Sequence, residues 1–227
     1  MKFFIENNEL DNSIQVIRRK IRTLMNGVVA DSMKEKGLVY KQNFGVDLPH
    51  LRELAKKYTA NHDLAQRLWA LQIRETMIMA TLIQPKDSFS ESTAEEWLQS
   101  VTNIELAEQI SMNLLSKLPY KNQFCLKLIK KDESWSRITG FTLSARLWNE
   151  LEIEQAKELV RLAVENSESD NFYLYKAVSS SLSRLCRRDK EMMTYVQQQV
   201  KTFEHSDKLS QQYIVGEIAN EISFLKF

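Results

Sequence analysis

Turn-forming residues are scarce in this sequence, and their scarcity restricts the folds open to it. Five glycines and three prolines occur among 227 residues, whereas these two residue types make up roughly 12% of an average protein. Sandwiches and barrels with many tight turns need more of both at their turns. Long runs without either residue, rich in Leu, Ala and Met, favour helices instead. We therefore expect an all-α protein.

Helix start signals recur along the chain at short intervals. Asp11-Asn12-Ser13 precedes apolar residues spaced three and four apart, Pro49 suits a first helical turn, and Asn103 precedes another periodic stretch. Ser92-Thr93-Ala94-Glu95 matches a capping box. In the second half of the chain, the pattern predicts helices near residues 119–131, 134–149, 152–166, 171–187, 189–203 and 207–225.

The spacing of these helices indicates a repeat architecture. About a dozen helices, taken in pairs, give a unit of roughly 35–45 residues, which is typical of HEAT-like and armadillo-like solenoids. No linker or low-complexity segment divides the sequence. We expect a right-handed α–α superhelix that forms a single HEAT-like repeat domain over residues 1–227. A globular all-α bundle is the alternative.

The charges are segregated along the chain although the net charge is only +1. Basic stretches lie at residues 14–22, 117–131 and 184–190, and acidic stretches lie at 91–108 and 150–170. A single run of like charge commonly marks a solvated helix face. Three basic runs along one chain favour a shared basic surface that folding would assemble.

Cysteine and histidine form no pattern typical of a metal site. Cys125 and Cys186 lie in apolar stretches without a CxxC or Cys/His partner, and the three histidines are scattered. We expect buried thiols in a reducing cytoplasm. No apolar run of membrane-spanning length, signal peptide, P-loop, Rossmann glycine motif or HExxH motif occurs. We therefore expect a cytoplasmic protein with no cofactor, no metal and no membrane partner.

Two segments are similar to the AlkD-like DNA alkylation repair family, a family of HEAT-like repeat DNA glycosylases. The first runs from Tyr40 to Arg52 as YKQNFGVDLPHLR and is followed by Leu68-Trp69 and Arg74-Glu75. The second, Tyr173-Leu-Tyr-Lys-Ala-Val178, resembles the family's Phe-Ile-Gln-Lys-Ala-Ile helix. The resemblance extends from about residue 12 to about residue 225. It identifies the chain as a divergent member of that family.

The resemblance implies a basic concave face that holds double-stranded DNA, alkylated DNA included. Such a face neutralises phosphates whatever the base sequence. The DNA-binding residues that the resemblance implies are Trp135, Arg137, Lys176 and Arg184. Trp135 and Arg137 lie at a predicted helix start, where phosphate binds well, and Lys176 and Arg184 are about two turns apart on one helix.

The catalytic carboxylate of the family has a partial counterpart in this sequence. The best-studied branch excises purines alkylated at N3 or N7, and a carboxylate and two Trp rings there surround the damaged nucleotide. The resemblance places Glu108 at the position of the catalytic Asp, or Gln109 if the register slips by one residue. Glu108 is therefore the candidate catalytic residue.

The two Trp rings have no counterpart in this sequence. Asn103 or Ile104 occupies the first ring position, and Ser181, or Ser180 after the same slip, occupies the second. A paired Arg-Arg of the family becomes Gln211-Gln212. Rings near a cation contribute roughly 0.5–2 kcal/mol per contact, so their loss removes stabilisation from the transition state.

We therefore predict a monomeric, DNA-binding HEAT-like repeat protein with weak or absent glycosylase activity. An active glycosylase for N3- and N7-alkylated purines and a HEAT-type scaffold that binds protein are the alternatives. A surface shared by residues 117–131, Arg137, Lys176 and Arg184 would favour DNA over protein. A carboxylate beside an aromatic ring would favour an enzyme over a binding protein.

Overall fold

The computed structural model describes residues 4–226, which form α-helices and two 3-10 turns and contain no β-strand. An isolated bridge between Gln42 and Ile73 is the only β-type pairing in that range. The prediction of an all-α protein is therefore confirmed. No helix within residues 4–226 is both long enough and apolar enough to cross a membrane. The helices divide into two compact units, one up to Leu118 and one from Pro119 onward.

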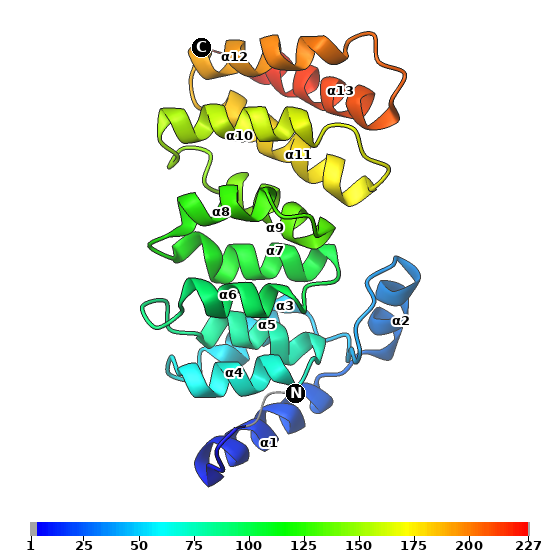
Figure 1. The fold of residues 1–227 in the computed structure, drawn as a ribbon. Helices are drawn as coiled ribbons and strands as arrows, with labels where there is room; N and C mark the ends of the chain where they lie inside the picture. The colour runs from blue at the N-terminus through cyan, green and yellow to red at the C-terminus, as the bar shows by residue number, and fades with distance from the viewer. Residues whose placement is uncertain (1–3, 227) are drawn as a thin grey trace. The chain divides into compact units, whose positions relative to one another are not determined.

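Unit 1, the part of the chain up to Leu118, contains seven α-helices and one 3-10 turn among its described residues (Figure 1). Its elements are α1 (Asn8–Thr23), α2 (Gly27–Glu35), α3 (Leu48–Ala55), α4 (His62–Ala70), α5 (Arg74–Ile83), α6 (Glu91–Leu98), α7 (Ile104–Asn113) and η1 (Leu115–Lys117).

Helix α5 forms the centre of the unit 1 core. All of its residues except Leu82 are buried, and it packs against α3, α4 and α7. On α4, the Trp69 ring stacks on that of Trp97 from α6, with centroids 4.2 Å apart, and Phe89 meets Trp97 edge-on at 4.9 Å. All three rings are buried. Trp69 and Trp97 therefore belong to the core of unit 1.

The turn before α3 depends on a glycine. Gly45 has φ +68°, and a Cβ atom on it would lie 2.1 Å from the carbonyl oxygen of Asn26. That oxygen is close because the Asn26 N–H donates to the Phe44 carbonyl at 2.8 Å. A side chain at position 45 would therefore be both strained and blocked. Pro49 follows in the first turn of α3, as predicted.

A buried ion cluster fixes the start of α5 to the loop that precedes α3. The Arg74 guanidinium donates to Glu75 at 3.0 Å and to both oxygens of Glu105 at 2.7 and 2.9 Å. The Glu75 carboxylate also accepts backbone N–H groups of that loop. The Tyr40 hydroxyl donates to Glu105, and burial followed by the Glu105 charge raises the pKa of Tyr40 well above its usual range. Arg74 and Glu75 therefore form an internal ion pair.

Unit 2, the part from Pro119 onward, contains six α-helices and one 3-10 turn among its described residues. Its elements are α8 (Lys121–Ile129), α9 (Ser134–Ser144), α10 (Ile153–Glu165), α11 (Phe172–Cys186), α12 (Lys190–Val200), η2 (Lys201–Phe203) and α13 (Leu209–Phe224).

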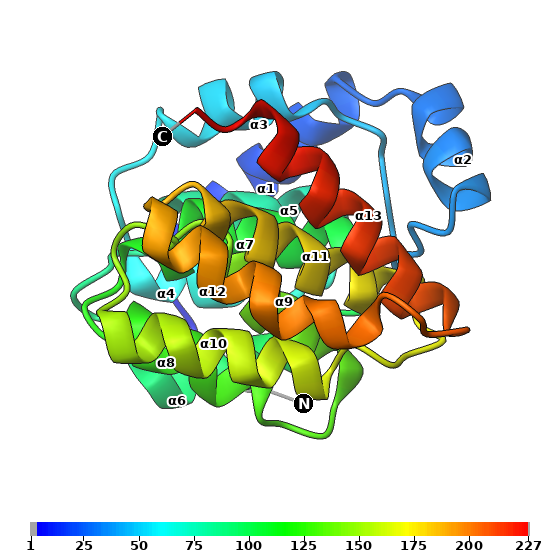
Figure 2. The same ribbon diagram turned by 90° about the horizontal axis from the view of Figure 1, so that it is seen from above.

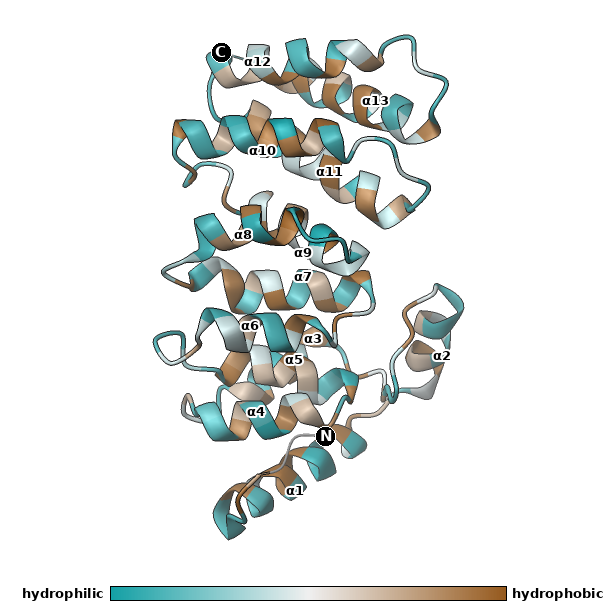
Figure 3. Cartoon of the chain, in the orientation of Figure 1, coloured by the Kyte–Doolittle hydropathy of each residue, from teal (hydrophilic) through white to brown (hydrophobic). Residues whose placement is uncertain are grey.

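The helices of unit 2 form two layers. Contacts link α8 to α10 and α10 to α12 in one layer, and α9 to α11 and α11 to α13 in the other, an arrangement visible in Figures 1 and 2. Figure 3 shows hydrophilic and hydrophobic residues alternating along α10, as expected for a helix that is half-covered. The α8 and α9 helices approach closely at Gly140, where a Cβ atom would lie 2.9 Å from the Cys125 carbonyl oxygen.

Two helix starts differ from the prediction. Helix α1 is capped by Asn7 instead of by Asp11-Asn12-Ser13, so it begins earlier in the chain. Helix α6 is capped by Ser90, and the predicted cap Ser92 lies inside the helix. Several cap-forming side chains follow one another at both places, and the sequence pattern does not rank them. The expected buried thiols are confirmed, because both Cys125 and Cys186 are free and buried.

Candidate nucleic-acid interface

One face of α11 is exposed along its whole length. Phe172, Lys176, Ser180, Arg184 and Arg187 are exposed and recur every three or four residues, which is the spacing of one helix face. The positions between them, apart from the half-buried Tyr173 and Ser183, are buried against α9, α10, α12 and α13. We call these five residues the α11 stripe. It is a continuous exposed surface of unit 2.

Two cations of the α11 stripe are unpaired. Among the described residues, neither Lys176 nor Arg184 forms an ion pair, and the Lys176 ammonium lies 5.6 Å from the centroid of the Phe172 ring. Arg187 differs, because it pairs with Glu221 of α13. Lys176 and Arg184 lie about 12 Å apart along the helix axis. The α11 stripe therefore presents two positive charges to a ligand.

The predicted residue Trp135 lies beside the first turn of α11. Its ring centroid is 5.8 Å from that of Tyr173, with the planes tilted by 35°. Trp135 is half-buried at the second position of α9. The structure thus brings Trp135 to the same end of α11 as Lys176. Arg184 lies two turns further along the helix.

The predicted residue Arg137 makes a contact within the protein. It is half-buried, and its Nη1 donates to the side-chain oxygen of Asn166 at 3.1 Å. Asn166 is the C-cap of α10, and its own amide donates to the Leu162 carbonyl at 2.8 Å. The Nε atom of Arg137 is buried without a hydrogen-bond partner among the described residues. Arg137 therefore supports the end of α10 and retains an unused donor.

The sequence did not single out the aromatic residues around Trp135 as a site. Phe172, Tyr173 and Tyr175 occupy the first turn of α11, and Tyr213 of α13 contacts two of them. The signal in the sequence was three aromatic residues within four positions at a predicted helix start. Tyr173 and Tyr175 carried the family resemblance, but their exposure depends on tertiary packing.

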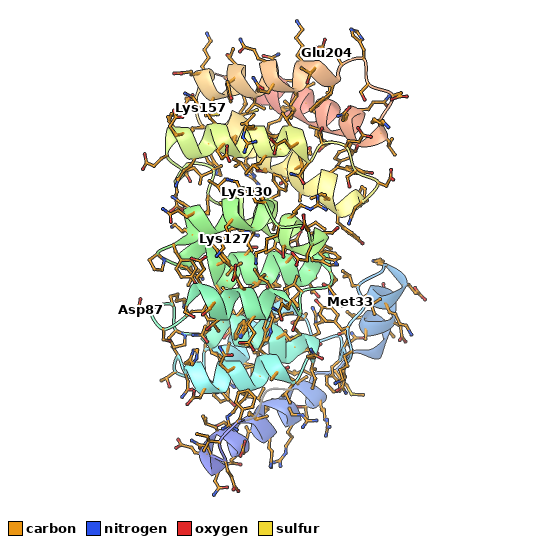
Figure 4. The ribbon with its side chains drawn as sticks, viewed as in Figure 1. Met33, Asp87, Lys127, Lys130, Lys157 and Glu204 are labelled. Atoms are coloured by element: carbon orange, nitrogen blue, oxygen red, sulfur yellow. The ribbon has the colours of Figure 1, made fainter. Side chains whose placement is uncertain are left out.

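The α8 part of the basic run at 117–131 does not lie in the same layer as the α11 stripe. Residues 121–129 form α8, which lies in the other layer of unit 2, and Figure 4 shows Lys127 and Lys130 there. Lys121 pairs with Glu150, and Lys130 pairs with Glu158 at 2.8 Å. For residues 121–130, the expectation of a surface shared with Lys176 and Arg184 is wrong, because a charge run does not specify which layer its helix joins.

The candidate catalytic residue Glu108 is exposed on α7 in unit 1. Gln109, the alternative in the other register, is buried and accepts a hydrogen bond from Asn113 at 3.2 Å. Of these two side chains, Glu108 is the one open to a ligand. Neither Asn103 nor Ile104 has an aromatic ring. Asn103 is buried, and it caps α7 by accepting a hydrogen bond from the Leu106 N–H at 3.0 Å.

The second ring position differs between the two registers. Ser181 is buried, and its hydroxyl lies 2.8 Å from that of Ser144 on α9. Ser180 is exposed within the α11 stripe, between Lys176 and Arg184. A side chain at position 180 therefore points outward on the exposed face of α11, whereas one at position 181 points into the packing between α9 and α11.

The sequence matches a protein family over most of its length. The family model described as DNA alkylation repair enzyme matches residues 17–211. This range includes Glu108, Trp135, Arg137, Lys176 and Arg184. No curated protein sequence matches the chain at a significant level.

Solved structures share the fold at low sequence identity. One is described as a new family of proteins related to the HEAT-like repeat DNA glycosylases with affinity for branched DNA structures. It matches with a TM-score of 0.78 and 15% identity, over 92% of this chain and 93% of the other. A designed armadillo repeat protein in complex with a (KR)4 peptide matches with a TM-score of 0.42 and 13% identity, over 95% of each chain. The first match confirms the predicted HEAT-like repeat solenoid fold.

Proposed function

Because the chain belongs to the DNA alkylation repair enzyme family, we propose that it binds double-stranded DNA through the α11 stripe. The observation that supports this most is the pair Lys176 and Arg184. Both are exposed, both lack an ion-pair partner among the described residues, and both lie on one helix face. Cations arranged in this way neutralise phosphates and release counterions without reading the bases.

The form of DNA is proposed from the relative of the same fold. That protein has affinity for branched DNA, and we propose that this chain likewise binds distorted, branched or damaged duplexes. Trp135 lies at one end of the α11 stripe and would contact the DNA there. Arg137, which is half-buried, would add its positive charge beside Trp135.

We propose binding without efficient base excision. Expulsion of a cationic alkylated purine depends on stabilising positive charge that develops on the sugar, which carboxylates and ring faces do. Glu108 is an exposed carboxylate, but the residues at the predicted ring positions are amide, aliphatic or hydroxyl side chains. Loss of the rings supports a function in DNA recognition.

The test is a titration of a labelled duplex at several salt concentrations. In the double variant Lys176→Ala, Arg184→Ala, we expect weaker binding and a smaller slope of log affinity against log salt, by about 0.9 for each phosphate that is no longer neutralised. The control is Lys157→Ala, Lys190→Ala, which removes the same charge from α10 and α12 in the other layer. Equal reductions of affinity in both double variants would contradict the proposal. Duplex binding that does not change with salt would also contradict it, because no phosphates would then be neutralised.

A further inference from the structure

Five aromatic rings form a continuous cluster at the first turns of α9, α11 and α13. We call them the aromatic cluster, and its members are Trp135, Phe172, Tyr173, Tyr175 and Tyr213. Trp135 contacts Tyr173 at 5.8 Å, and Tyr173 contacts Phe172 at 5.7 Å. Phe172 contacts Tyr175 at 5.4 Å and Tyr213 at 6.3 Å, and the two tyrosines lie 5.3 Å apart. Three helices that are distant in sequence thus supply one group of rings.

The aromatic cluster is more exposed than packing alone requires. Phe172 is 46% exposed, Trp135, Tyr173 and Tyr213 are half-buried, and only Tyr175, at 8%, is buried beneath them. In unit 1, by contrast, the rings of Trp69, Trp97 and Phe89 are 5% exposed or less. Large apolar side chains gathered at an exposed site commonly mark a binding surface. The aromatic cluster therefore has ring faces available to a ligand.

Positive charge adjoins the aromatic cluster directly. The Lys176 ammonium lies 5.6 Å from the centroid of the Phe172 ring and forms no ion pair among the described residues. Arg137, two residues after Trp135 on α9, is half-buried and supplies a second cation. A ligand that fits has a flat aromatic face next to an anionic group. A nucleotide has both.

Resting on the proposed function, we propose that the aromatic cluster binds an unpaired nucleobase of DNA by stacking. Lys176 would hold the phosphate of that nucleotide, and Arg184 would hold the paired strand further along the α11 stripe. Every base has a ring face that stacks on an aromatic side chain, so such a site tolerates any sequence. In a fully paired duplex these faces are covered by neighbouring bases. The site therefore selects branched or gapped DNA over duplex.

The test compares two DNAs, a three-way junction with unpaired bases at the branch point and a fully paired duplex with the same number of phosphates. Wild type is expected to prefer the junction. Phe172→Ala is expected to lose about 5- to 100-fold of the junction affinity, the usual effect of removing one stacking ring, and with it the preference for the junction over the duplex. Phe172→Leu, which retains apolar bulk, is expected to lose the junction preference as well.

The matched control is Phe224→Ala, since Phe224 is a 76% exposed ring at the other end of α13 and lies outside the aromatic cluster. A 2-aminopurine base at the unpaired position gives a direct readout, because stacking quenches its fluorescence. Wild-type affinity of Phe172→Ala or of Phe172→Leu for the junction overturns the stacking site and leaves the proposed function intact. Absence of DNA binding by wild type overturns both.

Discussion

The Arg187 guanidinium and the Glu221 carboxylate form a two-point ion pair between α11 and α13, with Nε–Oε1 at 2.5 Å and Nη2–Oε2 at 2.9 Å. The hydrogen bonds from Arg187, with the added charge of Arg184, hold the pKa of Glu221 below its usual range. Glu221 therefore stays ionised at neutral pH and neutralises one cation of the α11 stripe. Arg184, which lacks such a partner among the described residues, keeps its charge available.

Replacing Glu221 by Gln should strengthen DNA binding. The change frees Arg187 at the exposed end of the α11 stripe, and neutralising one additional phosphate steepens the salt dependence by about 0.9 in the log–log slope. The measurement is the affinity for duplex DNA at several salt concentrations. Glu204→Gln, which removes one negative charge from an exposed site beyond α12, is the control and should leave the slope unchanged. A slope that stays at the wild-type value in Glu221→Gln would show that Arg187 does not reach the DNA.

The ion cluster around Glu158 should make stability depend on acid pH. Hydrogen bonds from Arg161 and then from Lys130 lower the pKa of Glu158 to about 2, against about 4.3 in an unfolded chain. A lowered carboxyl pKa stabilises the fold above the unfolded value, and that contribution is lost as pH falls from about 4 to about 2. Urea unfolding should show Glu158→Gln less stable than wild type at neutral pH.

As pH falls through about 2, the free energies of unfolding of the two proteins should converge, because Glu158 then becomes protonated in the folded as well as in the unfolded state. Glu154→Gln is the control, since the Glu154 side chain is 84% exposed in its contact with Lys157. A difference between wild type and Glu158→Gln that persists unchanged at low pH would mean that packing, and not charge, accounts for it.

Two glycines of unit 2 should respond in opposite directions to the same substitution. A Cβ atom at Gly140 would meet the Ile129 side chain at 2.7 Å and backbone atoms of α8 at 2.9 Å, whereas Gly216 has nothing within 4 Å. Gly140→Ala should therefore cost about 1–3 kcal/mol through overpacking. Gly216→Ala should stabilise the protein by about 0.5–1 kcal/mol, because alanine favours the helix. Denaturant unfolding of both variants measures the contrast, and a stable Gly140→Ala variant would mean that α8 and α9 separate readily.

Excision of methylated bases should be weak or absent. Under single-turnover conditions with DNA containing 7-methylguanine, we expect little release by wild type and no further loss in Glu108→Gln, while both proteins bind duplex normally. The reason is that Asn103, Ile104 and the serine at the second ring position offer no cation-binding ring face. Rapid release by wild type, abolished in Glu108→Gln, would establish Glu108 as the catalytic carboxylate of an active glycosylase.

The sequence predicted features that depend on neighbouring residues. The first helical turn at Pro49 and the cap at Asn103 both agree with the structure. Each is set by local backbone chemistry or by a short motif, so the pattern contains the information needed. The helical class followed from the scarcity of glycine and proline for the same reason.

Features that depend on which layer a helix joins were not predictable. Lys130 and Lys176 both lie in basic or mixed segments, yet Lys130 belongs to α8 and pairs with Glu158, while Lys176 lies on α11 without an ion pair among the described residues. The aromatic cluster likewise joins Trp135, Phe172 and Tyr213 from three helices. No short-range pattern brings such residues together, because their contacts arise when α9, α11 and α13 pack.

The hydroxyl contact between Ser144 and Ser181 bears on how a sequence with this fold changes its chemistry. With 2.8 Å between the two oxygens, a ring at position 181 would push α9 and α11 apart. A ring at position 180 would stand in the open between Lys176 and Arg184 and leave the packing intact. Of these two neighbouring positions, 180 is the one where a single substitution can add or remove an aromatic ring on the exposed face of α11 without disturbing the packing of α9 against α11.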